Sequence, residues 1–366
     1  MDKGVYEAVG RVLEDPRVTS ISTLMEEDPV LRKSDVPQET LTAIWYLKTR
    51  RRMKVRLPKF RSPRTAVGVF LSWWGSRRVL AEIAEDESVA LAHCLLARTL
   101  LTVYYLGLEG GVVAKTDVPG GEGSSKVEDP QWVESLAALV TRESMKAQRI
   151  RERVSRALRD PYSDQIGLPP EIGDQIDECV AADLHYSPLS DRIRRLMGLE
   201  YEYLLQEKVA NVRMAYLSEQ EMLQKGYAKT PDVRLQVPVL IKPPPILHPY
   251  VVSPPSASSG SSGSSAPSDP SGLSGGSSGS SSSSHSVLPV PVNWIESKAS
   301  FGDKLAIDQD VKQFRGYRDR MGPGAVIYWF GYVVQDAAPL LNEGILILSS
   351  FPPSSSIIQL PVDTPE

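Results

Sequence analysis

The hydrophobic pattern of the chain changes near Gly198, and this change constrains the fold more than any other feature of the sequence. Before it, apolar residues recur at intervals of three and four, and the breaks fall at Pro or Gly, which is typical of helices. After a last helical segment, Gly198–Val212, apolar residues alternate with polar ones or run continuously between turn residues, which is typical of strands. The sequence predicts an all-helical N-terminal region over 1–195 and an α/β domain over 196–352.

The second region predicts a mixed central sheet flanked by helices. The expected elements are, in order, strands near Val212–Leu217, Val233–Ile241 and Val290–Lys298, a helix over Ile307–Met321, and strands over Ala325–Tyr332 and Gly344–Phe351. Gly322-Pro323-Gly324 ends the helix. The strand that follows is apolar on both faces, which is typical of a central strand.

A serine-rich segment interrupts this second region over 243–287. Of residues Ser253–Ser286, 19 of 34 are serine, and glycine and proline make up most of the rest. Such a composition cannot bury enough apolar surface to offset its ordering entropy, so we expect a disordered insert. Because apolar strands adjoin it on both sides, we interpret it as a long loop inside one domain, with an interdomain linker as the alternative. Residues 353–366 are predicted to form a flexible tail.

Cysteine content and hydropathy exclude several classes of protein. Cys94 and Cys179 are the only cysteines, and both lie in apolar helical surroundings. This argues against a disulfide framework and favours a reducing compartment. The apolar stretch Val89–Val113 is long enough to span a bilayer, but His93 and Arg98 lie within it. A buried helix is therefore favoured over a membrane span, and no membrane partner is expected.

Two acidic residues and a lysine lie at strand ends that a hairpin would bring together. Asp232 opens the strand Val233–Ile241, whereas Glu296 and Lys298 close the strand Val290–Lys298. A hairpin with arms of equal length would place these ends side by side, with Glu296 and Lys298 on one face. Asp232 and Glu296 would then offer hard oxygen ligands to Mg²⁺ or Mn²⁺, and Lys298 would orient a water and stabilise charge on a phosphodiester.

Taken alone, this pattern is weak, because a turn aspartate beside an exposed cross-strand ion pair would look the same. The acid-x-Lys spacing also occurs at Asp310/Lys312. That copy lies on a predicted helix, where residues two apart diverge by about 200° and cannot share one metal ion.

Residues on two predicted helices favour a catalytic site. Gln313 and Tyr317 lie one turn apart on the helix after the third strand, a spacing that can reach back to the carboxylates. On the helix before the first strand, Glu202 flanks the apolar stripe more closely than Glu200. Glu202 is therefore the candidate third carboxylate, with a solvated helix glutamate as the alternative.

With these motifs in order, the chain resembles the PD-(D/E)xK, or restriction-endonuclease-like, superfamily. More closely, the segments Lys225–Asp232, Trp294–Asp303 and Gly322–Trp329 resemble the codanin-interacting nuclease family. The resemblance covers roughly Leu158 to Phe351. It implies a restriction-endonuclease-like core behind a helical N-terminal region, a codanin-like partner and a location in nucleus and cytoplasm. The long Ser/Gly insert departs from the family pattern and puts the mode of partner binding in doubt.

A basic segment in the N-terminal region is a candidate nucleic-acid contact. No acidic residue lies between Glu39 and Glu82. The basic residues chosen as candidate DNA contacts are Arg50, Arg51, Arg52, Lys54 and Arg56. A helix with this charge can contact several phosphates. A nuclear import signal and a solvated basic face are the alternatives.

The remaining signals narrow the choice of chemistry. The four histidines have no His or Cys neighbours at ligand spacing, which argues against zinc. No phosphate-binding Gly loop follows a strand, which argues against a nucleotide cofactor. We therefore expect a Mg²⁺- or Mn²⁺-dependent nuclease that hydrolyses DNA, with a non-catalytic nuclease-fold scaffold or a DNA-binding adaptor as the alternatives.

Overall fold

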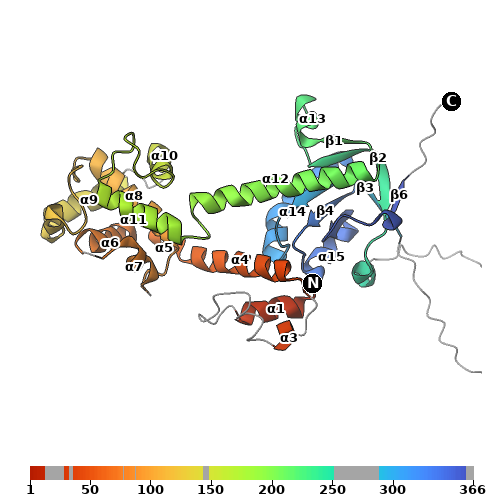
Figure 1. Ribbon diagram of the computed structural model, residues 1–366, viewed down its shortest axis with the longest axis horizontal. Coiled ribbons are helices and arrows are strands. Elements are labelled where there is room, and N and C mark those ends of the chain that lie inside the picture. Colours follow the sequence, from red (N-terminus) through yellow and green to blue (C-terminus); the bar gives the residue numbers. More distant parts are fainter. Residues whose placement is uncertain are drawn as a thin grey trace, which may run out of the picture. The chain divides into compact units, whose positions relative to one another are not determined.

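The computed structural model describes residues 1–12, 29–32, 36–76, 78–86, 88–142, 148–250 and 288–359. The chain divides into two compact units, one formed by Glu7–Glu200 and the other by Met1–Tyr6 with Tyr201–Glu366 (Figure 1). Most of the predicted serine-rich insert, residues 251–287, lies outside the described residues, as does the end of the predicted tail, residues 360–366.

The first unit is helical throughout its described residues. Its helices are the last part of α1 (Lys3–Val12), α3 (Pro29–Arg32), α4 (Gln38–Val55), α5 (Leu57–Phe60), α6 (Pro63–Trp74), α7 (Leu80–Glu85), α8 (His93–Glu109), η1 (Glu122–Glu128), α9 (Pro130–Arg142), α10 (Gln148–Ala157), α11 (Pro170–Ala182) and the first part of α12 (Pro188–Asn211). Helix α12 begins well before the predicted Gly198, because Ser187 accepts a hydrogen bond from the Ser190 amide at 3.2 Å and caps it.

Helix α8 lies at the centre of this unit. It contacts α6, α7, α9, α10 and α11, and nearly all of its residues are buried. Aromatic rings from α6 and α8 pack together, with the Trp74 and Tyr104 ring centroids 6.0 Å apart. The prediction that the apolar stretch Val89–Val113 forms a buried helix is confirmed. No helix in the described part of the chain is both long enough and apolar enough to cross a bilayer.

A buried carboxylate ties α8 to the loop before α12. Asp183 is 4% exposed, and its Oδ2 accepts a hydrogen bond from the Cys94 amide at 2.8 Å, near the start of α8. Its Oδ1 accepts from the amides of His185 and Tyr186 at 2.9 and 2.8 Å. One side chain thus accepts hydrogen bonds from three buried backbone amides, each of which would lower the stability of the fold if it had no acceptor.

The second unit is built on a mixed open sheet. Its remaining elements are β1 (Tyr216–Ser218), α13 (Glu219–Gln224), β2 (Val233–Ile241), η2 (Pro245–Tyr250), β3 (Val290–Lys298), α14 (Lys304–Met321), β4 (Gly324–Tyr328), α15 (Val334–Asn342), β5 (Ile345–Leu348), η3 (Ser354–Ser356) and β6 (Ile357–Gln359). The strand order is β1-β2-β3-β4-β5, and β6 pairs with β2. Strands β1, β2 and β3 are antiparallel, whereas β3, β4 and β5 are parallel. The predicted mixed sheet flanked by helices is confirmed.

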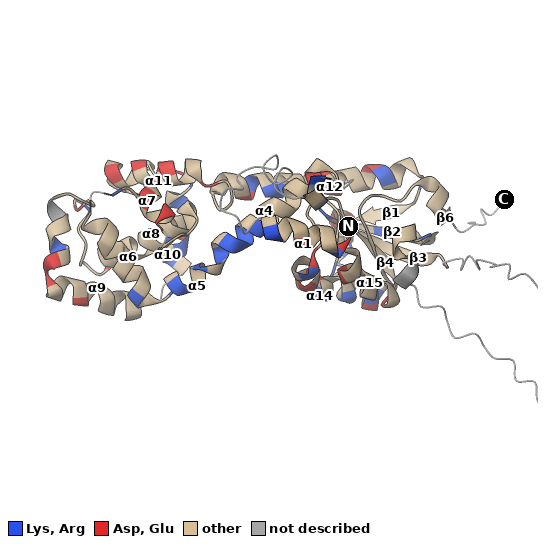
Figure 2. Ribbon diagram, turned by 90° about the horizontal axis from the view of Figure 1, so that it is seen from below, with Lys and Arg blue, Asp and Glu red and all other residues tan. Residues whose placement is uncertain are grey.

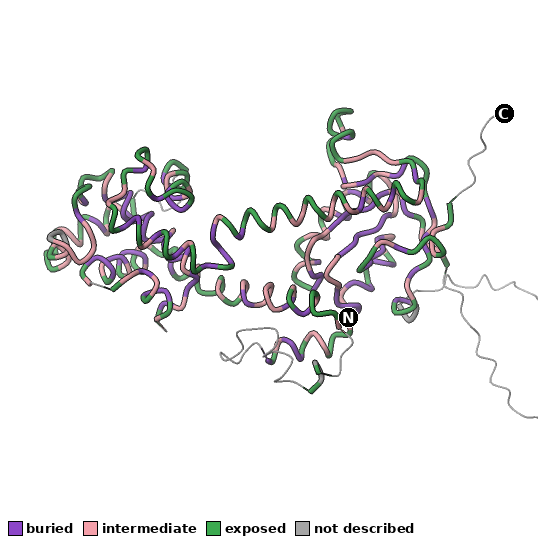
Figure 3. Tube along the Cα trace, viewed as in Figure 1, coloured by how far each residue is buried: buried purple, intermediate pink, exposed green. Residues whose placement is uncertain are grey.

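The centre of the sheet is fully buried, as expected for parallel strands joined by helices. Every residue of β4 and β5 is buried, and Figure 3 shows the strands as buried traces inside the unit. Strand β4 ends at Tyr328 rather than at the predicted Tyr332. Gly331 adopts φ = +91° there, and its amide donates to the Tyr328 carbonyl at 2.9 Å, which turns the chain out of the sheet.

Strand β2 changes partners along its length. Its first half pairs with β1 and its second half with β6. Strands β1 and β6 therefore lie one after the other along the edge of β2 that faces away from β3. The register with β3 shifts between Arg234 and Val239, where β2 carries Pro238. Proline has no amide hydrogen to donate to a ladder, and it is confined to edges and bulges. Residues Ile357–Gln359 fall in the predicted flexible tail, and their pairing with β2 was not foreseen.

The register shift decides which residues face each other across β2 and β3. Beside the site, Val233 pairs with Ile295, so Asp232 is the next residue in register with Glu296. Arms of equal length would have set Asp232 opposite Lys298. That part of the sequence-based prediction is wrong, because the irregular stretch takes up additional residues of β2.

Glycine at the start of β4 allows β3 to pack closely. A Cβ atom on Gly324 would lie 2.1 Å from Cε2 of Trp294, and the Trp294 indole donates to the Gly322 carbonyl at 2.9 Å. Trp294 is fully buried. The turn that ends α14 therefore fits beneath an aromatic side chain of β3 and fixes where β4 begins.

Candidate active site

Three predicted site residues meet at the end of β3. The Ser297 amide donates a hydrogen bond to Asp232 Oδ2 at 2.6 Å, which holds Asp232 at the entry to β2 against the β3 backbone. Lys298 Nζ lies 2.9 Å from Glu296 Oε1. Asp232 and Glu296 are cross-strand neighbours, and such pairs have Cβ atoms roughly 5 Å apart. The structure thus brings two carboxylates and one ammonium together.

Helix α14 adds two side chains to this group. Gln313 Nε2 donates to Glu296 Oε1 at 3.0 Å, and Gln313 Oε1 accepts from Lys298 Nζ at 3.2 Å. One turn later, Tyr317 Oη accepts from Gln313 Nε2 at 2.6 Å and donates to the Thr230 carbonyl at 3.0 Å. This chain of hydrogen bonds joins α14 to the Thr230-Pro231-Asp232 segment and holds the carboxylate and ammonium in fixed positions.

The start of α14 is fixed by its own cap. Asp303 Oδ1 accepts a hydrogen bond from the Ala306 amide at 3.0 Å, which satisfies a free donor of the first turn. Gln313 and Tyr317 follow at helical spacing and therefore face the same side. Asp310 accepts from Tyr328 Oη at 3.0 Å instead of joining the site, so the second acid-x-Lys pair does not converge on these carboxylates.

Burial makes ionisation of these carboxylates costly. Desolvation, followed by the charge of Glu296, raises the pKa of Asp232 to about 8. Desolvation also raises the pKa of Glu296, although Lys298 opposes the rise. Burial alone would lower the pKa of Lys298, but the carboxylates of Glu296, Asp310 and Asp232 raise it above its usual value. Ionisation of both carboxyl groups would therefore leave negative charge that one lysine only partly offsets.

Glu202 on α12 lies within electrostatic range of this group. Its pKa is raised by burial and by the charge of Glu219, and it is lowered by Lys298. The charge of Glu202 also raises the pKa of Asp232. The side chain is thus near the site, but no hydrogen bond ties it to the other carboxylates in the described part of the chain.

Glu219 is a site residue that the sequence reasoning missed. It is the first residue of α13 and accepts a hydrogen bond from Thr230 Oγ1 at 3.0 Å. Its charge raises the pKa of Glu202, Glu296 and Tyr317. A sequence signal existed, because Ser218 and Glu221 form a capping box that starts a helix directly after β1 and so places Glu219 next to β2.

The fit of a divalent cation rests on two carboxylates rather than three. No set of three or more Asp, Glu, His or Cys side chains among the described residues is arranged to hold a metal ion. Oε2 of Glu296 is, however, buried without a hydrogen bond of normal geometry, and the neighbouring Asp232 carboxylate is destabilised when ionised. Mg²⁺ commonly binds one or two carboxylates and completes its shell with water and phosphate oxygens. The residues present fit such an ion.

The predicted DNA-contacting residues lie in the helical unit. Arg50, Arg51, Arg52 and Lys54 occupy the last turns of α4, and Arg56 is its C-cap. Figure 2 shows basic residues over consecutive turns of α4 and around α5. None of these side chains contributes to the carboxylate and lysine group described above, which is formed entirely by residues of the sheet unit.

Comparison with known proteins agrees with the order of these motifs. A family described as "Protein of unknown function TPD sequence-motif" matches residues 169–247 and 284–351. That match includes Thr230-Pro231-Asp232 and the segment with Glu296 and Lys298. CDAN1-interacting nuclease 1 of Mus musculus is 32% identical over 200 residues, which are 54% of this chain and 53% of the mouse protein. The chain is thus similar in sequence to CDAN1-interacting nuclease 1.

CDAN1-interacting nuclease 1 of two other vertebrates is similar to the chain to the same degree. The Homo sapiens protein is 31% identical over 200 residues, covering 54% of this chain and 53% of its own length. The Xenopus laevis protein is 32% identical over 200 residues, covering 54% and 50%. The chain thus spans about half the length of the curated relatives it matches. No solved structure matches the chain.

Proposed function

We propose that this chain is a divalent-metal-dependent nuclease of the PD-(D/E)xK type that hydrolyses phosphodiester bonds of DNA. The observation that carries the proposal is the meeting of Asp232, Glu296 and Lys298 at the end of β3. The names of the relatives, which describe nucleases that interact with CDAN1, support it independently. The mixed sheet, with its site where the antiparallel and parallel parts meet, is compatible with a restriction-endonuclease-like core.

The residues of the site take separate roles in this proposal. Asp232 and Glu296 would hold Mg²⁺ or Mn²⁺, which would polarise the phosphate and lower the pKa of a bound water. Lys298 orients the attacking water and stabilises negative charge that develops on the phosphate oxygens. Gln313 positions Lys298 and Glu296 through its two hydrogen bonds. Glu202 is the candidate third carboxylate.

The partners and location in this proposal rest on the resemblance to these relatives. A codanin-like protein is the proposed partner, because the relatives carry that interaction in their names. DNA is the proposed substrate, and Arg50, Arg51, Arg52, Lys54 and Arg56 are proposed to contact its phosphates. A location in nucleus and cytoplasm is proposed with them.

Cleavage of labelled DNA by the purified full chain tests the enzymatic proposal. Duplex, flap and single-stranded DNA are incubated with Mg²⁺, with Mn²⁺ or with a chelator. We expect cleavage only with metal, and its loss in Lys298→Ala and Glu296→Gln. Lys312→Ala is the matched control, because Lys312 belongs to the acid-x-Lys pair that lies outside the site, and it should cleave normally. Metal-independent cleavage, or cleavage that survives Lys298→Ala, would reject the proposed site.

A second candidate is a non-catalytic nuclease-fold scaffold or DNA-binding adaptor in a codanin-type complex. The observation that favours it is that Glu296 Oε1 is already bound by Lys298 and Gln313. This candidate predicts no cleavage of any of the three DNA forms and unchanged binding of the codanin-like partner in Lys298→Ala. Loss of partner binding in that variant would count against it.

A further inference from the structure

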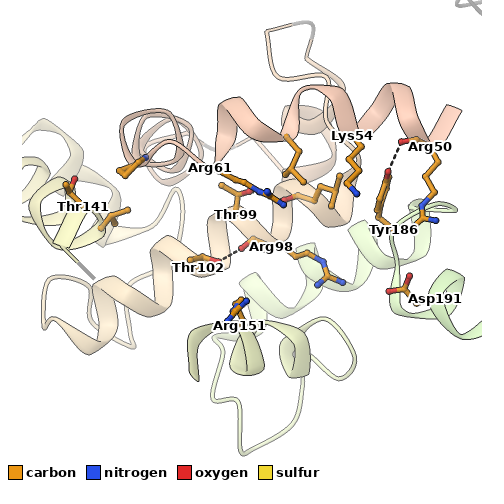
Figure 4. A pocket seen from close by; sticks show the side chains of 14 residues that line it. Arg50, Lys54, Arg61, Arg98, Thr99, Thr102, Thr141, Arg151, Tyr186 and Asp191 are labelled. Carbon is orange, nitrogen blue, oxygen red and sulfur yellow. Dashed lines mark hydrogen bonds between the residues drawn. The ribbon is translucent and has the colours of Figure 1, made fainter. Parts of the chain in front are cut away.

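The helical unit contains a cavity whose walls carry several positive charges. Its volume is about 730 Å³, which is within the usual range for sites that bind small molecules. The cationic residues that line it come from four separate segments. They are Arg50 and Lys54 on α4, Arg61 directly after α5, Arg98 on α8 and Arg151 on α10. Figure 4 shows these side chains around a common space.

The cavity has little negative charge to balance these cations. Among the described residues that line it, Asp191 is the single acidic one, and it already forms an ion pair with Arg194. Within the described part of the chain, Lys54, Arg61, Arg98 and Arg151 have no salt-bridge partner. Converging like charges repel one another, so an arrangement of this kind favours an anionic ligand.

The hydroxyl groups of the cavity lining donate to backbone carbonyls, so the cationic side chains are the main hydrogen-bond donors available to a ligand. Thr99 Oγ1 donates to the Leu95 carbonyl at 3.0 Å, and Thr102 Oγ1 donates to the Arg98 carbonyl at 2.6 Å. These hydroxyl hydrogens are therefore already used within α8. Guanidinium and ammonium groups bind phosphate oxygens with short, charge-assisted hydrogen bonds, and guanidinium does so with two parallel bonds.

The one aromatic residue of the lining is also occupied. Tyr186 Oη donates to the Arg50 carbonyl at 2.6 Å, and the Arg50 guanidinium lies over the Tyr186 ring at 5.1 Å from its centroid. Among the described lining residues, Tyr186 is the only aromatic one, and Arg50 covers a face of its ring, so the lining offers little surface for the stacking that usually binds single-stranded bases. The cavity is suited to phosphate groups rather than to bases.

The placement of the cations also distinguishes a compact ligand from an extended one. A nucleic-acid backbone that crosses a protein surface is met by basic residues in a stripe. Here α4, α8, α10 and the turn after α5 direct their charges toward one partly open pocket (Figure 4). Several phosphates held close together satisfy this geometry better than phosphates spaced along a strand.

We propose that this cavity binds a compact polyphosphate group, supplied by a small polyphosphate molecule or by the phosphorylated end of a nucleic-acid strand. The inference concerns a binding site in the helical unit and does not depend on hydrolysis at Asp232 and Glu296. Arg98 and Arg151, which enter from α8 and α10, are the residues that separate this site from the basic surface of α4.

Calorimetric titration of the full chain with inorganic tripolyphosphate, in metal-free buffer, tests the proposal. We expect one bound tripolyphosphate per chain. The double variant Arg98→Gln/Arg151→Gln should weaken its affinity about tenfold or more, because two charge-assisted contacts are lost. Arg156→Gln/Arg159→Gln is the matched control. It removes the same charge from the end of α10 and the turn after it, outside the cavity lining, and should change the affinity less than about twofold.

Competition with oligonucleotides separates the two sources of phosphate. Displacement of tripolyphosphate by a 5′-phosphorylated oligonucleotide, but not by its 5′-hydroxyl counterpart, identifies a strand end. Failure of both to compete identifies a small polyphosphate. Equal competition by both would overturn the proposal in favour of a general backbone contact. Absence of tripolyphosphate binding, or equal weakening by both double variants, would overturn it as well. Circular dichroism of both variants verifies folding, and Lys54→Gln provides a third readout if the Arg98 variant does not fold.

Discussion

Gln313 on α14 donates its side-chain amide hydrogen to Glu296 on β3 at 3.0 Å. The same amide group accepts from Lys298 through its oxygen. Each half of one planar group is therefore matched to a partner of the correct polarity, which fixes both the carboxylate and the ammonium that the proposed chemistry needs.

Replacement of Gln313 should lower the rate of cleavage without unfolding the protein. Gln313→Ala removes these two hydrogen bonds and the one to Tyr317, so Lys298 loses a contact that fixes its position, and we expect the rate constant of cleavage to fall about tenfold or more. Single-turnover cleavage of labelled DNA gives the rate. Gln309→Ala, one turn earlier on α14 at a residue that is exposed and makes no contact with Glu296 or Lys298 in the described structure, should leave it unchanged. A rate that is the same in both variants would contradict a positioning role.

The pKa of Asp232 predicts how stability depends on pH in the absence of metal. Its folded value is about 8, above the ordinary 3.8, so the unfolded chain releases this proton first as the pH rises. The free energy of unfolding should therefore fall between pH 4 and pH 8. The contribution of Asp232 to this fall in the free energy of unfolding should exceed about 1 kcal/mol, because a difference of one pKa unit between the folded and unfolded states corresponds to about 1.4 kcal/mol.

Asp232→Asn isolates this contribution, because asparagine carries no titrating proton. Thermal unfolding of both proteins at pH 5 and pH 8 should show a smaller decrease in Tm for the variant. Adding Mn²⁺ at pH 8 should raise the Tm of the unsubstituted chain and leave that of the variant nearly unchanged. An equal metal-dependent increase in both would show that the ion binds elsewhere.

Gly324→Ala should destabilise the sheet unit. The added methyl group would lie 2.1 Å from Trp294, which is fully buried and cannot move aside without disturbing β3. We expect a loss of about 1–3 kcal/mol, measured by denaturant unfolding. Gly68→Ala is a useful contrast, because nothing lies within 4 Å of its Cβ position in the middle of α6. Alanine there should be neutral or slightly stabilising.

Asp183→Ala should destabilise the helical unit. It leaves the amides of Cys94, His185 and Tyr186 without their acceptor in a buried site, and we expect a loss of about 2–4 kcal/mol. Thermal unfolding followed by circular dichroism measures the effect. Asp177→Ala on the exposed side of α11 should not change the midpoint. If the two variants behaved alike, the proposed role of Asp183 would be wrong.

Local patterns in the sequence were enough to predict the mixed sheet and the proximity of Asp232, Glu296 and Lys298 at adjoining strand ends. Alternation and turn residues place β2 and β3, and the acid-x-Lys motif follows from the pleat, because residues two apart share a face. The register was predicted wrongly because pairing depends on how many residues an irregular stretch uses. Pro238 was a usable sign, since proline within a strand marks an edge or a bulge.

The polyphosphate cavity could not be predicted from the sequence. Arg61, Arg98 and Arg151 are far apart along the chain, and their helices converge only through packing around α8. The basic run in α4 was visible, but nothing in it indicates which of its side chains enter a cavity. Glu219 was missed for a related reason, because a helix of six residues has too little periodicity to be recognised.

The pairing of β6 with the second half of β2 has a consequence for the tolerance of this fold to insertion. The chain leaves β2 at Ile241, and β6 covers the outer backbone edge of the residues just before that point. Segments of very different length can therefore be accommodated between β2 and β3 without uncovering an edge on which another chain could add a strand. Truncation before Ile357 would remove this cover and leave Val239–Ile241 as a template for self-association.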